Sequence, residues 1–201
     1  MNSIIVLGGS YLQSEFISNA VEKKYDVHVI DANEDCHCST YNITFHNFSF
    51  TDVDKVLNLV NKIKAVSIIS PSNEKGNLIA ARISKNNDIL YNSIETVNLT
   101  IDKYLMRKHL SLDLEFKQAK IFQTPDQLTF PVIVKPSSSS ASRGISMAFS
   151  ESELENSVLL ASKYTNSKDE ILIEEFIQGK QYSLETITKN GNHYLVGITE
   201  E

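Results

Sequence analysis

The residues best suited to chemistry are a lysine and the serine-rich segment that follows it. Lys135 ends the apolar run 131–134, and after Pro136 the chain reads Ser-Ser-Ser-Ser-Ala-Ser-Arg-Gly over residues 137–144. A buried ammonium group is costly unless it meets an anion, and small residues let backbone N–H groups and hydroxyls close over phosphates. This segment therefore predicts a phosphate clamp. The alternative is a lysine that reaches solvent from a strand end beside a flexible serine linker.

A second segment strengthens the first interpretation. Residues 171–179 read Ile-Leu-Ile-Glu-Glu-Phe-Ile-Gln-Gly, an apolar strand that runs into two acidic residues and then an apolar pair. Such a segment can present backbone C=O and N–H groups to the edge of an adenine, while apolar side chains pack on the faces of the ring. Together with the clamp, it predicts a nucleotide site.

The glycine pair near the N-terminus is a weaker motif. Gly8 and Gly9 occupy a strand-to-helix turn where a dinucleotide fold carries Gly-x-Gly-x-x-Gly, but positions 10 and 13 are serine and glutamine. Without those glycines, close approach of the backbone to a pyrophosphate is not assured. Asp31 would suit a ribose, although acidic residues also commonly end strands. We expect a small-ligand or structural role for this turn.

These residues need strands and helices to position them, and the first half of the chain alternates the two. That pattern is typical of a parallel sheet with crossover helices, so we predict an α/β, doubly wound domain over residues 1–92. Thr51 or Asp52 can cap its second helix. The expected strands are 4–7, 27–31, 65–69 and 89–91, and the expected helices are 12–24, 53–63 and 75–86.

The second half is predicted to contain an α+β unit that carries the clamp. A helical linker over 93–115, whose second helix opens at 102–107, should precede a lid subdomain over 116–178 and the start of a further subdomain over 179–201. The expected strands are 131–135, 145–149 and 171–173, with a hairpin of 182–188 and 193–198 around Asn-Gly at 190–191. A capping box at 150–153 should begin a helix with an apolar face of Leu154, Val158, Leu159 and Ala161.

Composition restricts the classes of partner. The formal net charge is -6 and the pI is about 5.4, which argues against nucleic acid as a partner. Apolar runs are far shorter than the ~20 residues that span a bilayer, and no signal-peptide pattern is visible, so we expect a cytoplasmic protein without a membrane partner. The spacing of Cys36 and Cys38 fits neither a metal knuckle nor a redox pair, which predicts reduced thiols in a loop.

The lysine strand, serine-rich loop and acidic segment, in this order, resemble the ATP-grasp superfamily over nearly the whole chain. Residues 1–92 are similar to its pre-ATP-grasp domain, and Asp102-Lys103 with Met106 resembles its entry helix. By analogy, Lys103 and Lys135 contact the phosphates of ATP. The loop residues implied to close over these phosphates are Ser138, Ser139, Ser140, Ser142 and Gly144.

The acidic segment resembles the hinge of the same superfamily. The resemblance implies that Glu174 orients the adenine amino group and that the backbones of Glu175 and Ile177 pair with the ring, with Phe176 between them. Gln181 stands where the superfamily often has a glutamate that holds the ribose hydroxyls. It can still form hydrogen bonds but carries no charge.

Within the superfamily, residues 6–10, 72–74 and 182–185 most resemble the carbamoyl-phosphate-synthase-like and amino-acid-ligase branch, which includes the pyrrolysine-pathway ligase. In that branch a carboxylate takes the γ-phosphate of ATP, and an amine then displaces the acyl phosphate. Open α/β sheets bind ligands at the carboxyl ends of their strands, so the candidates for the second substrate are Gly9, Ser10, Asn73 and Glu74. Ordinary turn and cap roles are the alternative for these four residues.

The resemblance thus implies an ATP-dependent carboxylate–amine ligase with small-molecule carboxylate and amine substrates, and it leaves a homodimer open. Members normally continue well beyond this length with the ligands for Mg²⁺, so we expect a truncated chain whose metal site lies outside it. Two other functions stay open. One is an ATP-grasp carboxylating enzyme, biotin-carboxylase-like or from a purine pathway, and the other is a non-catalytic nucleotide-binding module.

Overall fold

The computed structural model describes residues 1–110, 128–165 and 171–200. The chain forms two compact units, Met1–Leu112 and Asp113–Glu201, and each has its own sheet and core. The finer division into a linker and subdomains stays a prediction.

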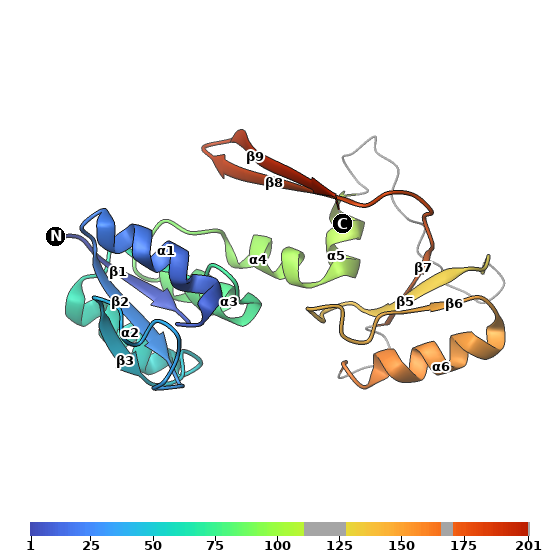
Figure 1. The fold of residues 1–201 in the computed structure, drawn as a ribbon, viewed down its shortest axis with the longest axis horizontal. Helices are drawn as coiled ribbons and strands as arrows, with labels where there is room; N and C mark the ends of the chain where they lie inside the picture. The colour runs from blue at the N-terminus through green and yellow to red at the C-terminus, as the bar shows by residue number, and fades with distance from the viewer. Residues whose placement is uncertain (111–127, 166–170, 201) are drawn as a thin grey trace. The chain divides into compact units, whose positions relative to one another are not determined.

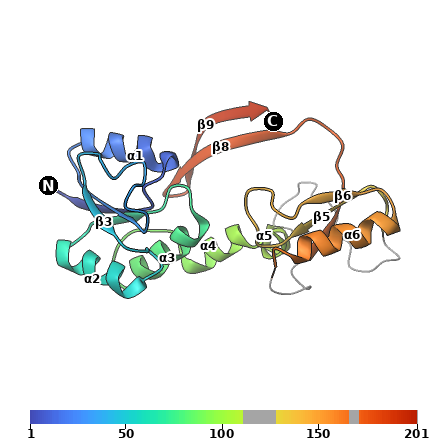
Figure 2. The same ribbon diagram turned by 60° about the horizontal axis from the view of Figure 1, so that its bottom comes forward.

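The first unit is the predicted doubly wound α/β domain. Its four parallel strands are β1 (Ser3–Leu7), β2 (Asp26–Asp31), β3 (Thr44–Asn47) and β4 (Ser67–Ile69), in the order β3-β2-β1-β4. The crossover helices are α1 (Tyr11–Glu22), α2 (Val53–Ile63) and α3 (Glu74–Lys85). Helix α1 covers one face of the sheet, and α2 and α3 cover the other (Figure 1 and Figure 2).

Strand β1 is buried on both sides, which explains its continuous apolar sequence. Ile4 and Val6 pack with Ile17 of α1, whereas Ile5 and Leu7 pack with residues of α2 and α3. The central strand therefore joins two cores, one on each face of the sheet.

Side-chain caps fix where the three crossover helices begin. Ser10 caps α1, Asp52 caps α2 and Asn73 caps α3, each by accepting a backbone N–H of the first turn. Of the two residues predicted to cap α2, the cap is Asp52. Because β1 and β4 are neighbours, Ser10 and Asn73 lie at the carboxyl ends of adjacent strands.

Two sequence predictions for this unit are wrong. Strand β3 was not expected, because the four residues Thr-Phe-His-Asn are too short and too polar to show a clear period. Residues 89–91 were expected to form a strand but pair with none of the described strands. Ile89 and Tyr91 instead pack against the core, and the Tyr91 hydroxyl donates to Asn77 Oδ1 at 2.5 Å.

Two short helices follow, as predicted. They are α4 (Ile94–Ile101), capped by Ser93, and α5 (Lys103–Leu110), whose first turn donates two backbone N–H groups to Asp102 Oδ1. In the part of the chain that the structure describes, no helix combines the length and apolar character needed to cross a bilayer.

The second unit contains a three-stranded antiparallel sheet in the order β6-β5-β7. Its strands are β5 (Val132–Pro136), β6 (Ser146–Ala148) and β7 (Ile171–Glu175), and helix α6 (Glu151–Ser162) packs on one face. The core between sheet and helix is formed by Val132, Val134, Ala148 and Ala161.

Helix α6 begins with the predicted capping box. Ser150 Oγ accepts the backbone N–H of Glu153, and the Glu153 carboxylate accepts the N–H of Phe149 at 2.9 Å. The predicted apolar face is wrong at Leu159, which is 62% exposed, while Ser157 is buried on this helix.

A separate hairpin ends the described chain. Strands β8 (Tyr182–Lys189) and β9 (Asn192–Glu200) are antiparallel, and Asn190 and Gly191 connect them at φ 52° and 77°. Two consecutive positive φ angles are typical of the type I′ turn that Asn-Gly predicts.

Candidate functional site

Lys135 and Glu174 lie side by side on neighbouring strands of the second unit. The antiparallel register pairs Lys135 of β5 with Leu172 of β7, and Ile133 with Glu174, so the two charged side chains are diagonal neighbours on one face of the sheet. Lys135 Nζ and Glu174 Oε2 form an ion pair. The side chains are only 14% and 3% exposed, so the pair is buried.

The same face carries apolar side chains around this pair. Strand alternation and register put Ile133, Met147 and Leu172 on the face of Lys135, whereas Val132 and Val134 point toward α6. Apolar walls around a few well-placed polar groups are the usual composition of a small-ligand site.

Burial strengthens the electrostatic interactions of the Lys135–Glu174 pair. Each ion loses solvation, and the loss is tolerated only because the opposite charge lies beside it. An anionic ligand near Lys135 would meet an ammonium group that is little screened by water but is already paired with a carboxylate. The arrangement can therefore offer a phosphoryl group one cation, whose charge it would share with Glu174.

The serine-rich loop that joins β5 to β6 has a buried base and an exposed tip. At the base, Ser137 and Gly144 are both buried, and Gly144 has a φ of 77°. A Cβ atom at Gly144 would lie 2.7 Å from Tyr164 Cδ2, so glycine is required there by packing as well as by backbone conformation. Ser138 and Ser142 are exposed, while Ser139 and Ser140 are half-buried.

The tip holds an unusual backbone. Ala141 and Ser142 both have a φ of 55°, a left-handed conformation that costs a residue with a Cβ roughly 1–2 kcal/mol. Arg143 braces this turn, since its Nε and Nη2 donate to the carbonyl and hydroxyl oxygens of Ser140 at 3.1 and 3.3 Å. Arg143 was not among the predicted site residues, although a cation inside a small-residue loop next to Lys135 was a usable signal.

The hinge residues continue directly from Glu174. Glu175 and Phe176 are half-buried, Ile177 is 56% exposed, and the backbone N–H of Phe176 donates to the Pro131 carbonyl at 3.4 Å. Gln181 is exposed just before β8. The structure thus brings Lys135, the serine loop and the hinge together in one unit.

Lys103 belongs to the other unit. It is the first residue of α5, within Met1–Leu112, so its predicted place beside Lys135 stays a prediction.

The turn after β1 has a structural explanation for each of its unusual residues. The N–H of Gly9 donates to Asp31 Oδ2 at 2.8 Å, and the N–H of Asn33 donates to Asp31 Oδ1 at 2.9 Å. A Cβ atom at Gly9 would lie 2.6 Å from Cys36 Sγ. Gly9 therefore allows the segment at Cys36 to pack closely, and both Asp31 carboxylate oxygens accept backbone N–H groups.

The residues predicted to bind the second substrate lie at the carboxyl ends of two strands, β1 and β4. Gly9 and Ser10 follow β1, and Asn73 and Glu74 follow β4, where Asn73 Oδ1 accepts the N–H of Gly76 at 3.0 Å. Turn and cap roles thus exist for Gly9, Ser10 and Asn73, and their substrate role stays a prediction.

Cys36 and Cys38 are free and buried beside this turn. Desolvation raises the pKa of both thiols, so they stay protonated near neutral pH and pack as small apolar groups.

The expected ligands for Mg²⁺ stay a prediction. Across residues 1–110, 128–165 and 171–200, no group of three or more His, Cys, Asp or Glu side chains is arranged to hold a metal ion.

A pocket of about 360 Å³ lies elsewhere in the first unit, between α1 and the strands, lined by Asn2, Phe16, Lys23 and Val66 among others. Asn2 and Val66 directly precede β1 and β4, so the pocket is at the amino ends of the strands. Open α/β sheets bind ligands at the opposite end, so we do not assign the candidate site to this pocket.

Comparison with known proteins gives a consistent result. Residues 94–200 match the family described as D-ala D-ala ligase C-terminus. A D-alanine–D-alanine ligase of Fervidobacterium nodosum is 31% identical over 86 residues, which is 43% of this chain and 26% of that protein. The chain therefore spans about a quarter of the length of this relative.

Solved structures share the fold over the whole chain. An L-amino acid ligase from Bacillus licheniformis superposes with a TM-score of 0.78 at 15% identity, covering 100% of this chain and 50% of that one. An N5-carboxyaminoimidazole synthetase from Staphylococcus aureus, complexed with ADP, gives 0.77 at 22% identity and covers 99% and 54%. At these identities the likeness establishes the fold alone.

Proposed function

This chain belongs to the D-ala D-ala ligase C-terminus family, an ATP-grasp family, and from that premise we propose that it is the ATP-binding part of a carboxylate–amine ligase. In the proposed reaction a carboxylate takes the γ-phosphate of ATP to give an acyl phosphate, and an amine displaces the phosphate. The observation that carries the proposal is the buried Lys135–Glu174 ion pair. In the chain, the serine loop follows Lys135 and the hinge follows Glu174.

The proposed roles follow from position and charge. Lys135 offsets negative charge on the phosphates, and Lys103 is proposed as a second cation for them. The tip residues Ser138, Ser139, Ser140 and Ser142 donate hydroxyl or backbone N–H groups as the tip closes, while Gly144 keeps its base in place. Closure would exclude water from an acyl phosphate that hydrolyses readily.

The hinge is proposed to hold the nucleoside. Glu174 orients the adenine amino group while it remains beside Lys135, so one carboxylate serves both the base and the phosphate cation. The backbones of Glu175 and Ile177 pair with the ring edge, Phe176 lies between them, and Gln181 reaches the ribose.

The second substrate is assigned to the first unit. We propose that the carboxyl ends of β1 and β4, with Gly9, Ser10, Asn73 and Glu74, bind part of the carboxylate or amine. Ser10 and Asn73 cap helices by accepting the N–H groups of Leu12 and Gly76, so the proposed donors for a carboxylate are the N–H groups of the same turns that the caps do not use.

The family favours a ligase over the two other functions. The D-alanine–D-alanine ligase relative is matched in sequence, whereas the carboxyaminoimidazole synthetase is similar in fold only. A carboxylating enzyme would require bicarbonate as a substrate, and a non-catalytic module would bind ATP without transferring phosphate.

Calorimetric titration of ATP into this chain tests the proposal. We expect Lys135→Ala to weaken ATP binding by about tenfold or more, roughly 1.4 kcal/mol, because the phosphate loses its cation. Lys189→Ala is the matched control, since Lys189 is an exposed lysine of the same unit and its loss should leave affinity unchanged.

A double variant separates loss of binding from loss of folding. Lys135→Met with Glu174→Gln removes both buried charges together, so the sheet is expected to stay folded while ATP binding is lost. A folded double variant that binds ATP as tightly as the original chain would refute the proposed site.

A further inference from the structure

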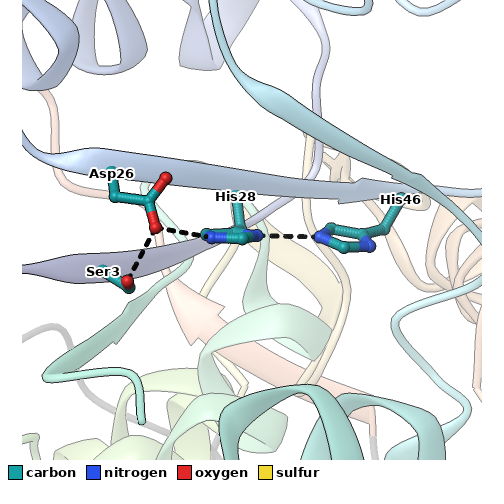
Figure 3. A network of polar contacts seen from close by, with 4 residues as sticks. All are labelled: Ser3, Asp26, His28 and His46. Carbon is teal, nitrogen blue, oxygen red and sulfur yellow. Dashed lines mark hydrogen bonds and ion pairs between the residues drawn. The ribbon is translucent and has the colours of Figure 1, made fainter. Parts of the chain in front are cut away.

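A chain of polar contacts crosses three strands of the first unit, whereas the proposed nucleotide site belongs to the second. Ser3 Oγ donates to Asp26 Oδ2 at 2.7 Å, and the same oxygen lies 3.0 Å from His28 Nε2 (Figure 3). His28 Nδ1 lies 2.9 Å from His46 Nε2. The order is therefore Ser3 on β1, Asp26 and His28 on β2, and His46 on the edge strand β3.

This order of contacts excludes a nucleophilic role for the serine. In a hydrolytic triad a histidine accepts the serine proton, whereas Ser3 here donates to the carboxylate of Asp26. The network is instead built around His28, which is 7% exposed and has a hydrogen-bond partner on each ring nitrogen.

The two imidazoles share one proton. Their rings are inclined by only 17° with centroids 5.2 Å apart, as expected for two rings joined edge to edge through an N–H···N bond (Figure 3). One of the two facing nitrogens must donate and the other must accept. If one of the two histidines is protonated, the other still has an acceptor nitrogen and the N–H···N bond is kept. If both are protonated, each facing nitrogen carries a hydrogen and neither can accept.

The groups around the two histidines oppose protonation of His46 when His28 is charged. Burial, then the charge of His28, and then that of Lys62 on α2 lower the pKa of His46. On the other side, hydrogen bonds from Ser3 and His28 and the charges of His28 and the N-terminus lower the pKa of Asp26. Phe48 packs edge-on against His46, and Lys55 of α2 lies over the Phe48 ring.

The pair joins two strands that lead to the proposed substrate end of the sheet. Strand β3 is paired only with β2 in its four-stranded sheet, so the His28–His46 bond is a side-chain tie on an edge strand. One residue further, Asn47 Nδ2 donates to the carbonyls of Asp31 and Ala32 at 3.4 and 3.2 Å. Asp31 in turn holds the N–H of Gly9.

We propose that the His28–His46 pair is a proton-sensitive clasp: when both histidines are protonated, their bond breaks and β3 loosens from β2. Movement of β3 would also disturb the turn at Gly9, because Asn47 of β3 bonds the Asp31 carbonyl and the Asp31 carboxylate bonds the Gly9 N–H. Mild acid would thus change the carboxyl ends of the strands in the first unit.

The direction follows from linkage. Because the folded state lowers the pKa of His46 below its ordinary value of 6.5, the unfolded chain binds protons more readily there. The stability that a neutral His46 contributes is therefore fully present above pH 6.5 and is lost as pH falls below it. The lowered pKa of Asp26 adds a further loss only as pH falls below 3.8.

Hydrogen exchange of the β3 amides, measured on this chain by mass spectrometry and corrected for intrinsic rates, tests the clasp. Between pH 7.5 and 5.5 we expect the opening of β3 to increase by up to about tenfold, because pH 5.5 lies one unit below the ordinary histidine value of 6.5. His46→Gln keeps an N–H donor toward His28 but cannot titrate, so this variant should show no such increase.

Two further variants keep the test decisive. His37→Gln removes an exposed histidine that contacts Tyr41 outside the network, and it should respond to pH as the original chain does. Asp26→Asn removes the carboxylate that favours a protonated neighbour, so the increase should begin at lower pH. A β3 opening that is unchanged between pH 7.5 and 5.5, or that rises equally in His46→Gln, would overturn the proposal.

Discussion

Each of the two units of this chain buries at least one ionisable side chain beside a polar partner, but they do so in different ways. In the first unit, Asp26 and His28 belong to a network in which each of the facing polar atoms has a hydrogen-bond partner. In the second unit, Lys135 and Glu174 form a buried ion pair among apolar side chains. The first is built on histidines, the residue type that serves as a pH switch in proteins, whereas the second joins a lysine to a carboxylate.

The histidine network of the first unit suits a structural role, and the ion pair of the second suits ligand binding. A histidine network can lose or gain a proton without leaving an isolated ion, so it suits a tie between strands. A lysine beside a carboxylate in an apolar setting suits a site where an anion is held. This contrast agrees with the proposed phosphate site in the second unit and with the proposed clasp in the first.

The largest effect is expected from breaking the ion pair on one side only. Glu174→Leu should destabilise the second unit by roughly 3–5 kcal/mol, because it leaves the Lys135 ammonium buried without its partner. Lys135→Met combined with Glu174→Leu should recover most of that loss. Urea unfolding followed by hydrogen exchange of β5 and β7 measures both values.

The control for this prediction is an exposed pair in the first unit. Lys55 and Asp52 are 3.0 Å apart with side chains 62% and 40% exposed, so Lys55→Ala should leave stability nearly unchanged. If Glu174→Leu were as mild as Lys55→Ala, the Lys135–Glu174 pair would not be buried in solution, and the contrast between the units would fail.

A smaller effect is expected at the base of the serine loop. Gly144 and Gly191 both have a φ of 77°, but a Cβ atom at Gly144 would meet Tyr164 and Pro136, whereas Gly191 has no atom within 4 Å of that position. Gly144→Ala should therefore cost about 2–3 kcal/mol, and Gly191→Ala about 1 kcal/mol. Thermal unfolding of the two variants compares them, and equal costs would show that the base of the loop is not packed as described.

The sequence predicted the parts of this fold that depend on short-range patterns. The apolar run of β1 and the caps Asp52 and Ser150 follow from periodicity and local hydrogen bonding, which neighbouring residues determine. Strand β3 and residues 89–91 depend on which strand lies alongside, and the sequence does not record that. Leu159 was misplaced because the face of α6 is set by the sheet beneath it.

The candidate site divides in the same way. Lys135 and Glu174 could be identified because each ends or interrupts an apolar strand, but their contact depends on the register of β5 with β7. His28 and His46 were overlooked because their contact also crosses two strands, one of which was not predicted. Pairings across strands are thus the information that the sequence alone lacked.

The smallest predicted effect compares two left-handed residues, one in each unit. Lys64 ends α2 at φ 51° and ψ 51°, and Ala141 lies at the loop tip at φ 55°. Lys64→Gly should stabilise the first unit by about 0.5–1 kcal/mol, because relief of Cβ strain exceeds the entropy that glycine adds to the unfolded chain. Ala141→Gly should give a similar gain if Arg143 holds the tip in this conformation in solution.

Chemical denaturation of both variants, each beside Arg143→Gln, measures the difference. The gain at Lys64 should not depend on Arg143, since Lys64 is fixed by backbone bonds to Val60 and Asn61. The gain at Ala141 should shrink when Arg143→Gln removes the brace on Ser140, because an unbraced tip can leave the left-handed region and relieve its strain without glycine. A gain at Ala141 that Arg143→Gln leaves intact would mean that the tip is as rigid as the helix end, and such a tip could not close over a nucleotide.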